Sequence, residues 1–155
     1  MRKNLIFADK EAAFLRELVK NKVPFMVVGL SAAALQGAPV VTQDIDLWFQ
    51  RLDHAGIRKA LKKVGGDYIS PIGLNPPMFA GKNLEMFDIV LTMSGLEDFK
   101  KEMSHTIAIP LGTFKIRVLS LERIIKSKEA ARREKDRLTL PVLKDSLAAI
   151  RSNQK

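Results

Sequence analysis

The alternation of apolar and polar residues along the chain predicts a mixture of helices and strands. Between residues 9 and 21, apolar side chains recur on one side at helical spacing, which is typical of an amphipathic helix. Short apolar runs predict strands, and the turn PLGT between two such runs predicts a hairpin. We expect strands over residues 25–29, 42–50, 84–92, 106–109 and 113–118. The remaining predicted helices cover residues 31–36, 53–64, 96–103, 120–133 and 135–150.

These elements do not alternate strictly between strand and helix, so they predict a mixed β-sheet flanked by helices, in the α/β or α+β class. Residues 69–80 contain three prolines, one glycine and no charged residue, and predict a loop. With 155 residues, the chain is long enough to bury a core of its own. We expect a core over residues 1–118 and a C-terminal helical extension of the same domain over residues 119–151.

Composition narrows the possible partners. The net charge of +9 favours anionic partners such as nucleotides or nucleic acid. The chain has no cysteine, which excludes disulfides and fits a cytoplasmic location. The apolar run over residues 23–41 approaches the roughly 20 residues of a membrane span, but two prolines and two glycines divide it into short pieces. We therefore expect neither a membrane-spanning segment nor a membrane partner.

Two aspartates lie in the predicted strand VTQDIDLWF, where strand interiors usually avoid aspartate. Side chains alternate along a strand, so Asp44, Asp46 and Trp48 share one face. The Cα atoms of the two aspartates lie about 6.6 Å apart, and carboxylates at this spacing can converge on one hard cation such as Mg²⁺. In the alternative interpretation, Asp44 caps a turn and Asp46 pairs with a surface cation.

A third carboxylate, Asp88, lies in the predicted strand LEMFDIVLT, on one face with Met86 and Val90. A carboxylate on an apolar strand is costly unless it is paired or binds a metal. If this strand lies beside the one that carries Asp44 and Asp46, three carboxylates meet on one face of the sheet. The alternative is a buried salt bridge with a lysine or arginine.

The segment VVGLSAAALQG predicts a strand that turns at Gly29 into a helix beginning near Ser31. Glycine allows an anion to approach the backbone, and the N-terminus of a helix favours phosphate. The alternative is a tight turn in which Ser31 caps the helix.

Basic residues gather on two predicted helices. In the C-terminal region, Lys128 falls on the apolar stripe of its helix, so its ammonium group can reach a phosphate or a carboxylate. We interpret Lys128 and Arg133 either as phosphate-binding residues or as partners in a salt bridge that fixes the helix to the sheet. The middle helix carries a basic cluster, which we interpret as a solvated face or, alternatively, as a nucleic-acid footprint: Arg58, Lys59, Lys62 and Lys63.

The order of the glycine turn, the Asp-x-Asp pair and the later aspartate resembles the polymerase-β-like nucleotidyltransferase superfamily. More narrowly, VVGLSAAALQGAPVVTQDIDLWF is similar to the small nucleotidyltransferase-like proteins of the AbiEii and minimal-nucleotidyltransferase type. KEAARREKD resembles the K-x-A-x-x-R-x-K-D run of those proteins.

The resemblance implies a metal-dependent nucleotidyltransferase that moves a nucleoside monophosphate from a nucleoside triphosphate to a hydroxyl on protein or RNA. It also implies a toxin–antitoxin or phage-defence setting. Mg²⁺ or Mn²⁺ would be held by Asp44, Asp46 and Asp88, and Asp88 would also accept a proton. The phosphates would be bound by Gly29, Leu30, Ser31, Lys128 and Arg133.

The chain departs from the family pattern at two positions. Leu30 replaces the second glycine or serine of the turn, and the arginine that often precedes the threonine is absent from APVVTQD. Two alternative functions therefore remain open: a catalytically degenerate binding module that serves as a partner subunit, and a basic RNA-binding protein.

Overall fold

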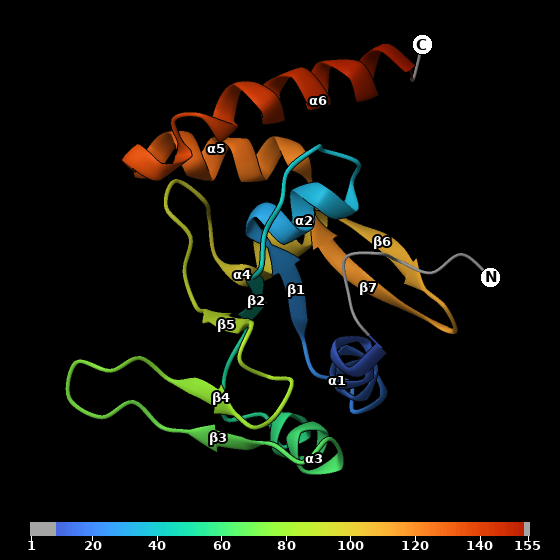
Figure 1. Cartoon of the computed structure of the whole chain (residues 1–155), viewed down its shortest axis with the longest axis vertical. Coiled ribbons are helices and arrows are strands. Elements are labelled where there is room, and N and C mark those ends of the chain that lie inside the picture. Colours follow the sequence, from blue (N-terminus) through green and yellow to red (C-terminus); the bar gives the residue numbers. More distant parts are fainter. Residues whose placement is uncertain (1–8, 154–155) are drawn as a thin grey trace.

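A five-stranded mixed sheet forms the centre of the structure, a computed structural model that describes residues 9–153 (Figure 1). The strand order is β5-β2-β1-β7-β6. Strand β1 pairs antiparallel with β2 and parallel with β7, while β2 pairs parallel with β5 and β6 antiparallel with β7. This arrangement confirms the mixed sheet and the hairpin. The strands are β1 (Phe25–Val28), β2 (Ile45–Phe49), β5 (Phe87–Val90), β6 (Thr106–Leu111) and β7 (Phe114–Leu119).

Helices flank the sheet. Helix α2 packs on β1, β2 and β7, and α5 packs on α2 and in turn supports α6. Helix α1 packs on β7 and α3. The helices are α1 (Asp9–Lys20), α2 (Gly29–Leu35), α3 (Ala55–Lys63), α4 (Phe99–Glu102), α5 (Leu121–Ala131) and α6 (Thr139–Asn153), with short 3₁₀ turns η1 (Met103–His105) and η2 (Glu134–Asp136).

The two faces of the sheet differ in chemistry. On one face, the Phe14 ring of α1 packs edge-on against Phe79 and Phe87, at centroid distances of 5.3 and 5.0 Å. On the other face, Trp48 packs against Phe99 at 5.8 Å. Because side chains alternate along β2, Asp46 lies on the face of Trp48, as the sequence pattern predicted. The face opposite Phe14, Phe79 and Phe87 therefore carries both the Trp48–Phe99 pair and the Asp46 carboxylate.

A separate two-stranded hairpin projects from the body of the protein (Figure 1). It consists of β3 (Asp67–Ile69) and β4 (Met78–Ala80), and we call residues 67–80 the β3–β4 finger. The prediction of a loop over residues 69–80 is therefore wrong at both ends, which form strands. There, cross-strand hydrogen bonding overrides the weak strand propensity of a segment that contains proline and glycine.

Several boundaries differ from the predicted ones. Strand β2 begins at Ile45 because the side chain of Thr42 bonds both the N–H and the C=O of Asp44 in a turn. Helix α5 ends where Arg132 adopts a left-handed conformation, with φ of 50°, and η2 separates it from α6. The apolar run over residues 23–41 folds as β1, α2 and a turn. Within residues 9–153, no helix is long and apolar enough to cross a membrane.

Candidate active site

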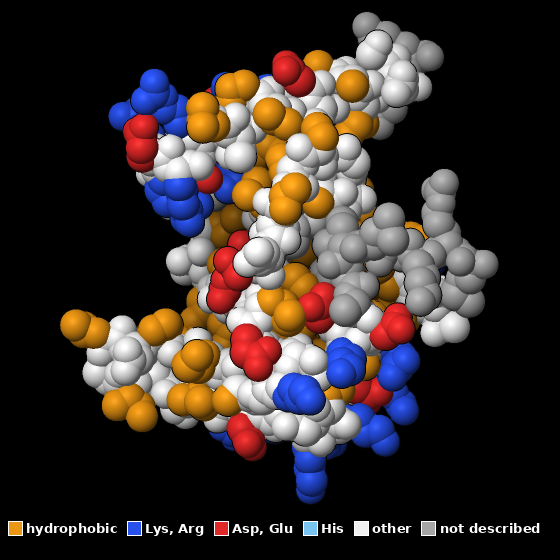
Figure 2. Space-filling view, viewed as in Figure 1, with side chains coloured by type: hydrophobic (Ala, Val, Ile, Leu, Met, Phe, Trp, Pro, Cys, Tyr) orange, Lys and Arg blue, Asp and Glu red, His pale blue; other side chains and the backbone are white. Residues whose placement is uncertain are grey.

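A pocket of about 670 Å³ lies between the sheet and the C-terminal end of α5. Carboxylates line its sheet side, and the opposite wall belongs to α5 and η2. In Figure 2, lysine and arginine side chains gather over the C-terminal end of α5, above acidic side chains in the middle of the molecule. The residues with polar or charged side chains that line the pocket are Thr42, Asp44, Asp46, Asp88, Thr92, Ser94, Ser127, Lys128, Arg133, Lys135 and Asp136.

Asp46 and Asp88 are brought together by the parallel pairing of β2 with β5, in which they are register partners. Asp46 is half-buried and Asp88 is exposed. Asp44 lies in the turn before β2, exposed at the rim of the same pocket. The pocket therefore collects all three carboxylates that the sequence singled out, and no lysine or arginine forms a salt bridge with Asp46 or Asp88 among the described residues.

Gly29 lies directly against the Asp46 carboxyl group. Its φ of +70° is in the left-handed region, and a Cβ at this position would lie 2.3 Å from Asp46 Oδ2. Any side chain here would collide with the carboxylate and would also strain the backbone. Glycine is therefore needed at this turn to make room for Asp46, in addition to any role with phosphate.

The electrostatics of the aspartate pair favour a bound proton. Burial raises the pKa of Asp46 to about 6, with further contributions from the charges of Asp88 and Asp44, while Lys128 and Lys135 act in the opposite direction. Burial and Asp44 also raise the pKa of Asp88, against the lowering effects of a hydrogen bond with Asp46 and of Lys135. Like charges held this closely are relieved by a proton or a cation.

The carboxylates of the pocket suit a hard divalent cation that takes only some of its ligands from the protein. Within the described part of the chain, no three histidine or acidic side chains are close enough to hold a metal ion by themselves. The close pair is Asp46 and Asp88, and Asp44 stands apart from it. Mg²⁺ is commonly held by one or two protein carboxylates and completes its coordination with water and substrate phosphates. Asp46 and Asp88 fit this requirement.

We call the side of the pocket that carries Lys128, Arg133 and Lys135 the basic wall, and Asp136 forms salt bridges with the first two of these residues. Lys128 Nζ lies 2.9 Å from Asp136 Oδ1, and Arg133 Nε lies 3.1 Å from Asp136 Oδ2. Burial alone would raise the pKa of Asp136, but the hydrogen bonds and charges of Lys128 and Arg133 lower it below its usual value. The predicted salt bridge from Lys128 to the sheet is wrong, because the bridge joins α5 to η2 instead.

The two residues after Gly29 occupy different environments. Leu30 is half-buried and lines the pocket. Ser31 is buried outside the pocket lining, and its hydroxyl donates to the Val28 carbonyl oxygen at 3.0 Å. Helix α2 begins at Gly29 with Val28 as its N-cap, so the alternative interpretation of Ser31 as the capping residue is wrong.

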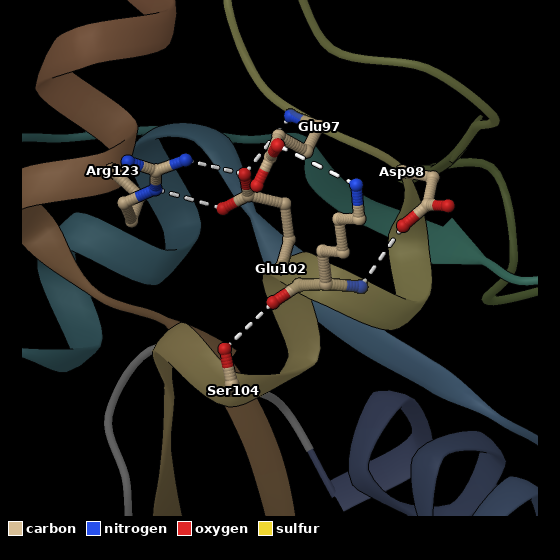
Figure 3. A network of polar contacts seen from close by, with 6 residues as sticks. Glu97, Asp98, Glu102, Ser104 and Arg123 are labelled. Carbon is tan, nitrogen blue, oxygen red and sulfur yellow. Dashed lines mark hydrogen bonds and ion pairs between the residues drawn. The ribbon is translucent and has the colours of Figure 1, made fainter.

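Sequence reasoning missed the pocket wall formed by Thr92, Met93 and Ser94. The segment that follows this wall is held by Glu102, whose carboxylate accepts from the backbone N–H of Glu97 at 3.0 Å and from Arg123 Nε at 2.8 Å (Figure 3). Glu102 is fully buried, and the hydrogen bond from Arg123 lowers its pKa. The only signal in the sequence is that Glu102 shares a helical stripe with Phe99, which indicates an inward-facing acid.

The other titratable candidates lie away from the pocket. The basic cluster of α3 is exposed, and Arg58 Cζ lies 5.5 Å from the centre of the Tyr68 ring. His54 caps α3, because its Nδ1 accepts from the backbone N–H of Gly56 at 3.0 Å.

Comparison with known proteins identifies the fold. No protein-family model matches the chain, and no curated protein matches its sequence. The structure is similar to a crystal structure of ANT(2'')-Ia in complex with adenylyl-2''-tobramycin, with a TM-score of 0.57 and 14% identity over 93% of this chain and 96% of that chain. It is also similar to an antigenic nucleotidyltransferase-like protein from Paracoccidioides brasiliensis, with a TM-score of 0.57 and 15% identity over 90% and 75% of the two chains.

A solution structure of ANT(2'')-Ia gives the same result, with a TM-score of 0.51 and 16% identity over 94% of this chain and 91% of that chain. The chain therefore has a nucleotidyltransferase-like fold, which confirms the predicted fold class, while membership of the polymerase-β-like superfamily stays a prediction. The narrower resemblance to the AbiEii type stays a prediction.

Proposed function

We propose that this protein is a metal-dependent nucleotidyltransferase that moves a nucleoside monophosphate from a nucleoside triphosphate to a hydroxyl group. The observation that carries the proposal is the pocket itself: Asp46 and Asp88 lie side by side on the sheet, and Lys128 and Arg133 line the facing wall. Within a nucleotidyltransferase-like fold, this arrangement presents anionic ligands for a cation and cationic groups for phosphates.

Asp46 and Asp88 are the proposed ligands of Mg²⁺ or Mn²⁺, with Asp44 at the pocket rim as a third contributor. The cation supplies neutralisation of the negative charge on the phosphate oxygens of the bound substrate. The backbone of Asp46 is positioned by β2 opposite Asp88, and Gly29 leaves room for its carboxyl group. Such preorganisation is what electrostatic catalysis requires.

The phosphates are proposed to bind between Gly29 and the basic wall. Lys128 and Arg133 approach from α5 and η2, and Lys135 adds charge at the same wall. Leu30 contributes only its backbone N–H there, because its side chain has no hydrogen-bonding group. Ser31 lies outside the pocket lining and its hydroxyl is bonded to Val28, so its proposed role is limited to shaping the turn that presents Gly29 and Leu30.

The chemical step is a substitution at the α-phosphorus. The acceptor oxygen forms a bond to the α-phosphorus, the bond from phosphorus to the β-phosphate oxygen breaks, and pyrophosphate leaves. The hydroxyl proton passes to the Asp88 carboxylate. Asp88 is exposed and lines the pocket, so its carboxylate is accessible to the acceptor hydroxyl.

The comparison supports adenylyl as the transferred group, because one similar structure holds adenylyl-2''-tobramycin. For this chain, the proposed acceptor is a hydroxyl on protein or RNA. The proposed setting is a cytoplasmic toxin–antitoxin or phage-defence system of the AbiEii type.

The test is label transfer from each of the four nucleoside triphosphates, labelled at the α-phosphate, to cell extract in the presence of Mg²⁺ or Mn²⁺. We expect metal-dependent labelling that is lost in Asp46→Asn and Asp88→Asn. Asp145→Asn, an exposed change on α6, serves as the control. Absence of transfer from every nucleotide, together with absence of metal-dependent nucleotide binding, overturns the proposal.

The second candidate is a catalytically degenerate binding module, which the replacement of the usual glycine or serine by Leu30 favours. This candidate predicts that the double variant Asp46→Asn with Asp88→Asn folds normally and retains its cellular function. Loss of cellular function in the folded double variant excludes it.

A further inference from the structure

The β3–β4 finger presents an apolar tip to solvent. Leu74 is 104% exposed, Ile72 70% and Met78 51%, so three large apolar side chains of one short segment face solvent together. Asp67, at the base, is the one charged residue of the finger, and residues 68–81 carry no charge, so the tip is neutral. In Figure 2, apolar side chains cover the end of this projection. Exposed apolar patches of this kind mark interaction sites.

The base of the finger is anchored firmly. Phe79 is 3% exposed and packs edge-on against Phe14 and Phe49, at centroid distances of 5.3 and 5.7 Å. Ile72 and Asn75 form an isolated bridge that closes the turn at the tip. The apolar tip is therefore presented on a fixed support.

Cations surround the base of the finger and not its tip. Helix α3 packs against β3, and Arg58 Cζ lies 5.5 Å from the centre of the Tyr68 ring. Lys82 follows the finger in sequence and is exposed. The remaining exposed cations of α3 are Lys59, Lys62 and Lys63.

We propose that the β3–β4 finger inserts into the surface of an anionic lipid bilayer while the α3 cations contact the lipid headgroups. From Ile69 to Gly73, a strand rise of about 3.3 Å per residue gives a reach of roughly 13 Å. Peripheral apolar groups enter a bilayer by about 5–10 Å, so the tip can reach the acyl chains while the cations stay at headgroup level. An inserted apolar group next to a basic surface is the combination that holds peripheral proteins on anionic membranes.

The distribution of side chains favours lipid over other partners. The exposed apolar residues come from β3, from the turn and from β4, and Figure 2 shows apolar side chains on both edges of the projection. A nucleic acid would require cations at the tip, where the sequence has none. The proposal departs from the expectation of no membrane partner, which rested on the lack of a spanning segment, because surface insertion needs only the finger. The inference is independent of the proposed catalytic function.

The test is flotation of the whole protein with vesicles of phosphatidylcholine alone or mixed with phosphatidylglycerol. We expect binding to the anionic vesicles, with affinity that falls as salt rises. The double variant Ile72→Asp with Leu74→Asp should bind at least roughly tenfold more weakly. The control is Leu138→Asp, which places a charge at a residue 84% exposed between η2 and α6, far from the finger.

The α3 cations are tested by Lys59→Glu with Lys62→Glu, for which each lost cation should weaken binding about fivefold. The matched control, Lys100→Glu with Lys126→Glu, makes the same change in net charge at exposed sites on α4 and α5. Absence of vesicle binding, equal binding to neutral and anionic vesicles, or unchanged binding of the Ile72/Leu74 variant overturns the proposal. A wild-type dimer in light scattering that this variant dissociates also overturns it, because the tip would then bind a second copy.

Discussion

Asp46 of β2 and Asp88 of β5 are register partners in a parallel strand pair, and both line the same pocket. Because two carboxylates held in this way repel each other, the native state favours a proton or a cation at the pair. This relationship has measurable consequences for stability, for metal binding and for the tolerance of neighbouring residues to substitution.

The stability of the metal-free protein should carry a pH-dependent contribution from Asp46. Its pKa rises from 3.8 to about 6 on folding, so between these values the folded state binds more protons than the unfolded state. The Asp46 contribution to stability therefore falls as pH rises from about 4 to 6 and then levels off. In EDTA at pH 8, Asp46→Asn should be more stable than the wild type by about 1–2 kcal/mol.

The measurement is urea unfolding of both proteins across this pH range. The informative quantity is the difference in unfolding free energy between them, because Glu102 and Asp136 have lowered pKa values and add the opposite trend to both proteins. A difference that does not change between pH 4 and pH 6 would contradict the prediction.

Addition of Mg²⁺ or Mn²⁺ should raise the melting temperature of the wild type, because a ligand that binds only the folded state stabilises it. At a concentration 100 times the dissociation constant, the gain is about 2.7 kcal/mol. Asp88→Asn should abolish the shift, and Asp145→Asn should retain it. The assay is thermal unfolding before and after chelation. Equal shifts in both variants would place the metal elsewhere.

Replacement of Gly29 by alanine tests the close approach to Asp46. Gly29→Ala introduces both backbone strain and a Cβ 2.3 Å from Asp46 Oδ2. Gly37→Ala is the matched control, because Gly37 also has a positive φ, of +97°, but no atom within 4 Å of the added Cβ. We expect a loss of about 1–2 kcal/mol for Gly37→Ala and about 2–5 kcal/mol for Gly29→Ala in denaturant unfolding. Equal losses would show that contact with Asp46 is unimportant.

Removal of the Asp136 charge should both destabilise the protein and weaken nucleotide binding. Asp136→Asn leaves Lys128 buried without its carboxylate partner, which should cost about 3 kcal/mol. Glu134→Gln breaks the exposed pair with Arg137 on the same turn and should cost less than about 1 kcal/mol. The measurements are urea unfolding and titration with a nucleotide analogue. Full nucleotide affinity in folded Asp136→Asn would show that the arrangement of the basic wall by Asp136 does not matter for nucleotide binding.

Local pattern was enough to predict much of the sheet. Strict alternation assigned Asp46 and Phe49 to opposite faces, and the glycine turn correctly separated β1 from α2. The apolar runs also located β5, so that the pairing of Asp88 with Asp46 followed once β5 lay beside β2. Each of these features depends on periodicity within a few residues.

Contacts between distant segments could not be predicted in this way. Gln36 donates to the Leu119 carbonyl oxygen at 2.8 Å and accepts from the Leu121 N–H at 2.9 Å. The N-cap residue of α5, Ser120, makes no capping hydrogen bond through its own side chain, so the distant Gln36 satisfies the start of this helix. The strands of the β3–β4 finger likewise depend on pairing across a loop, not on strand propensity. Such partners are chosen by tertiary packing, which one sequence does not reveal.

The central position of β1 has a consequence for the growing chain. Strand β1 pairs with β2, which follows it closely, and with β7, which is synthesised much later. The carboxylates of the pocket therefore emerge from the ribosome well before α5 and η2 supply Lys128 and Arg133. A nascent chain that has emerged only as far as β5 carries the proposed cation ligands but not the basic residues of the facing wall, so the proposed nucleotide site is complete only after α5 and η2 have been synthesised.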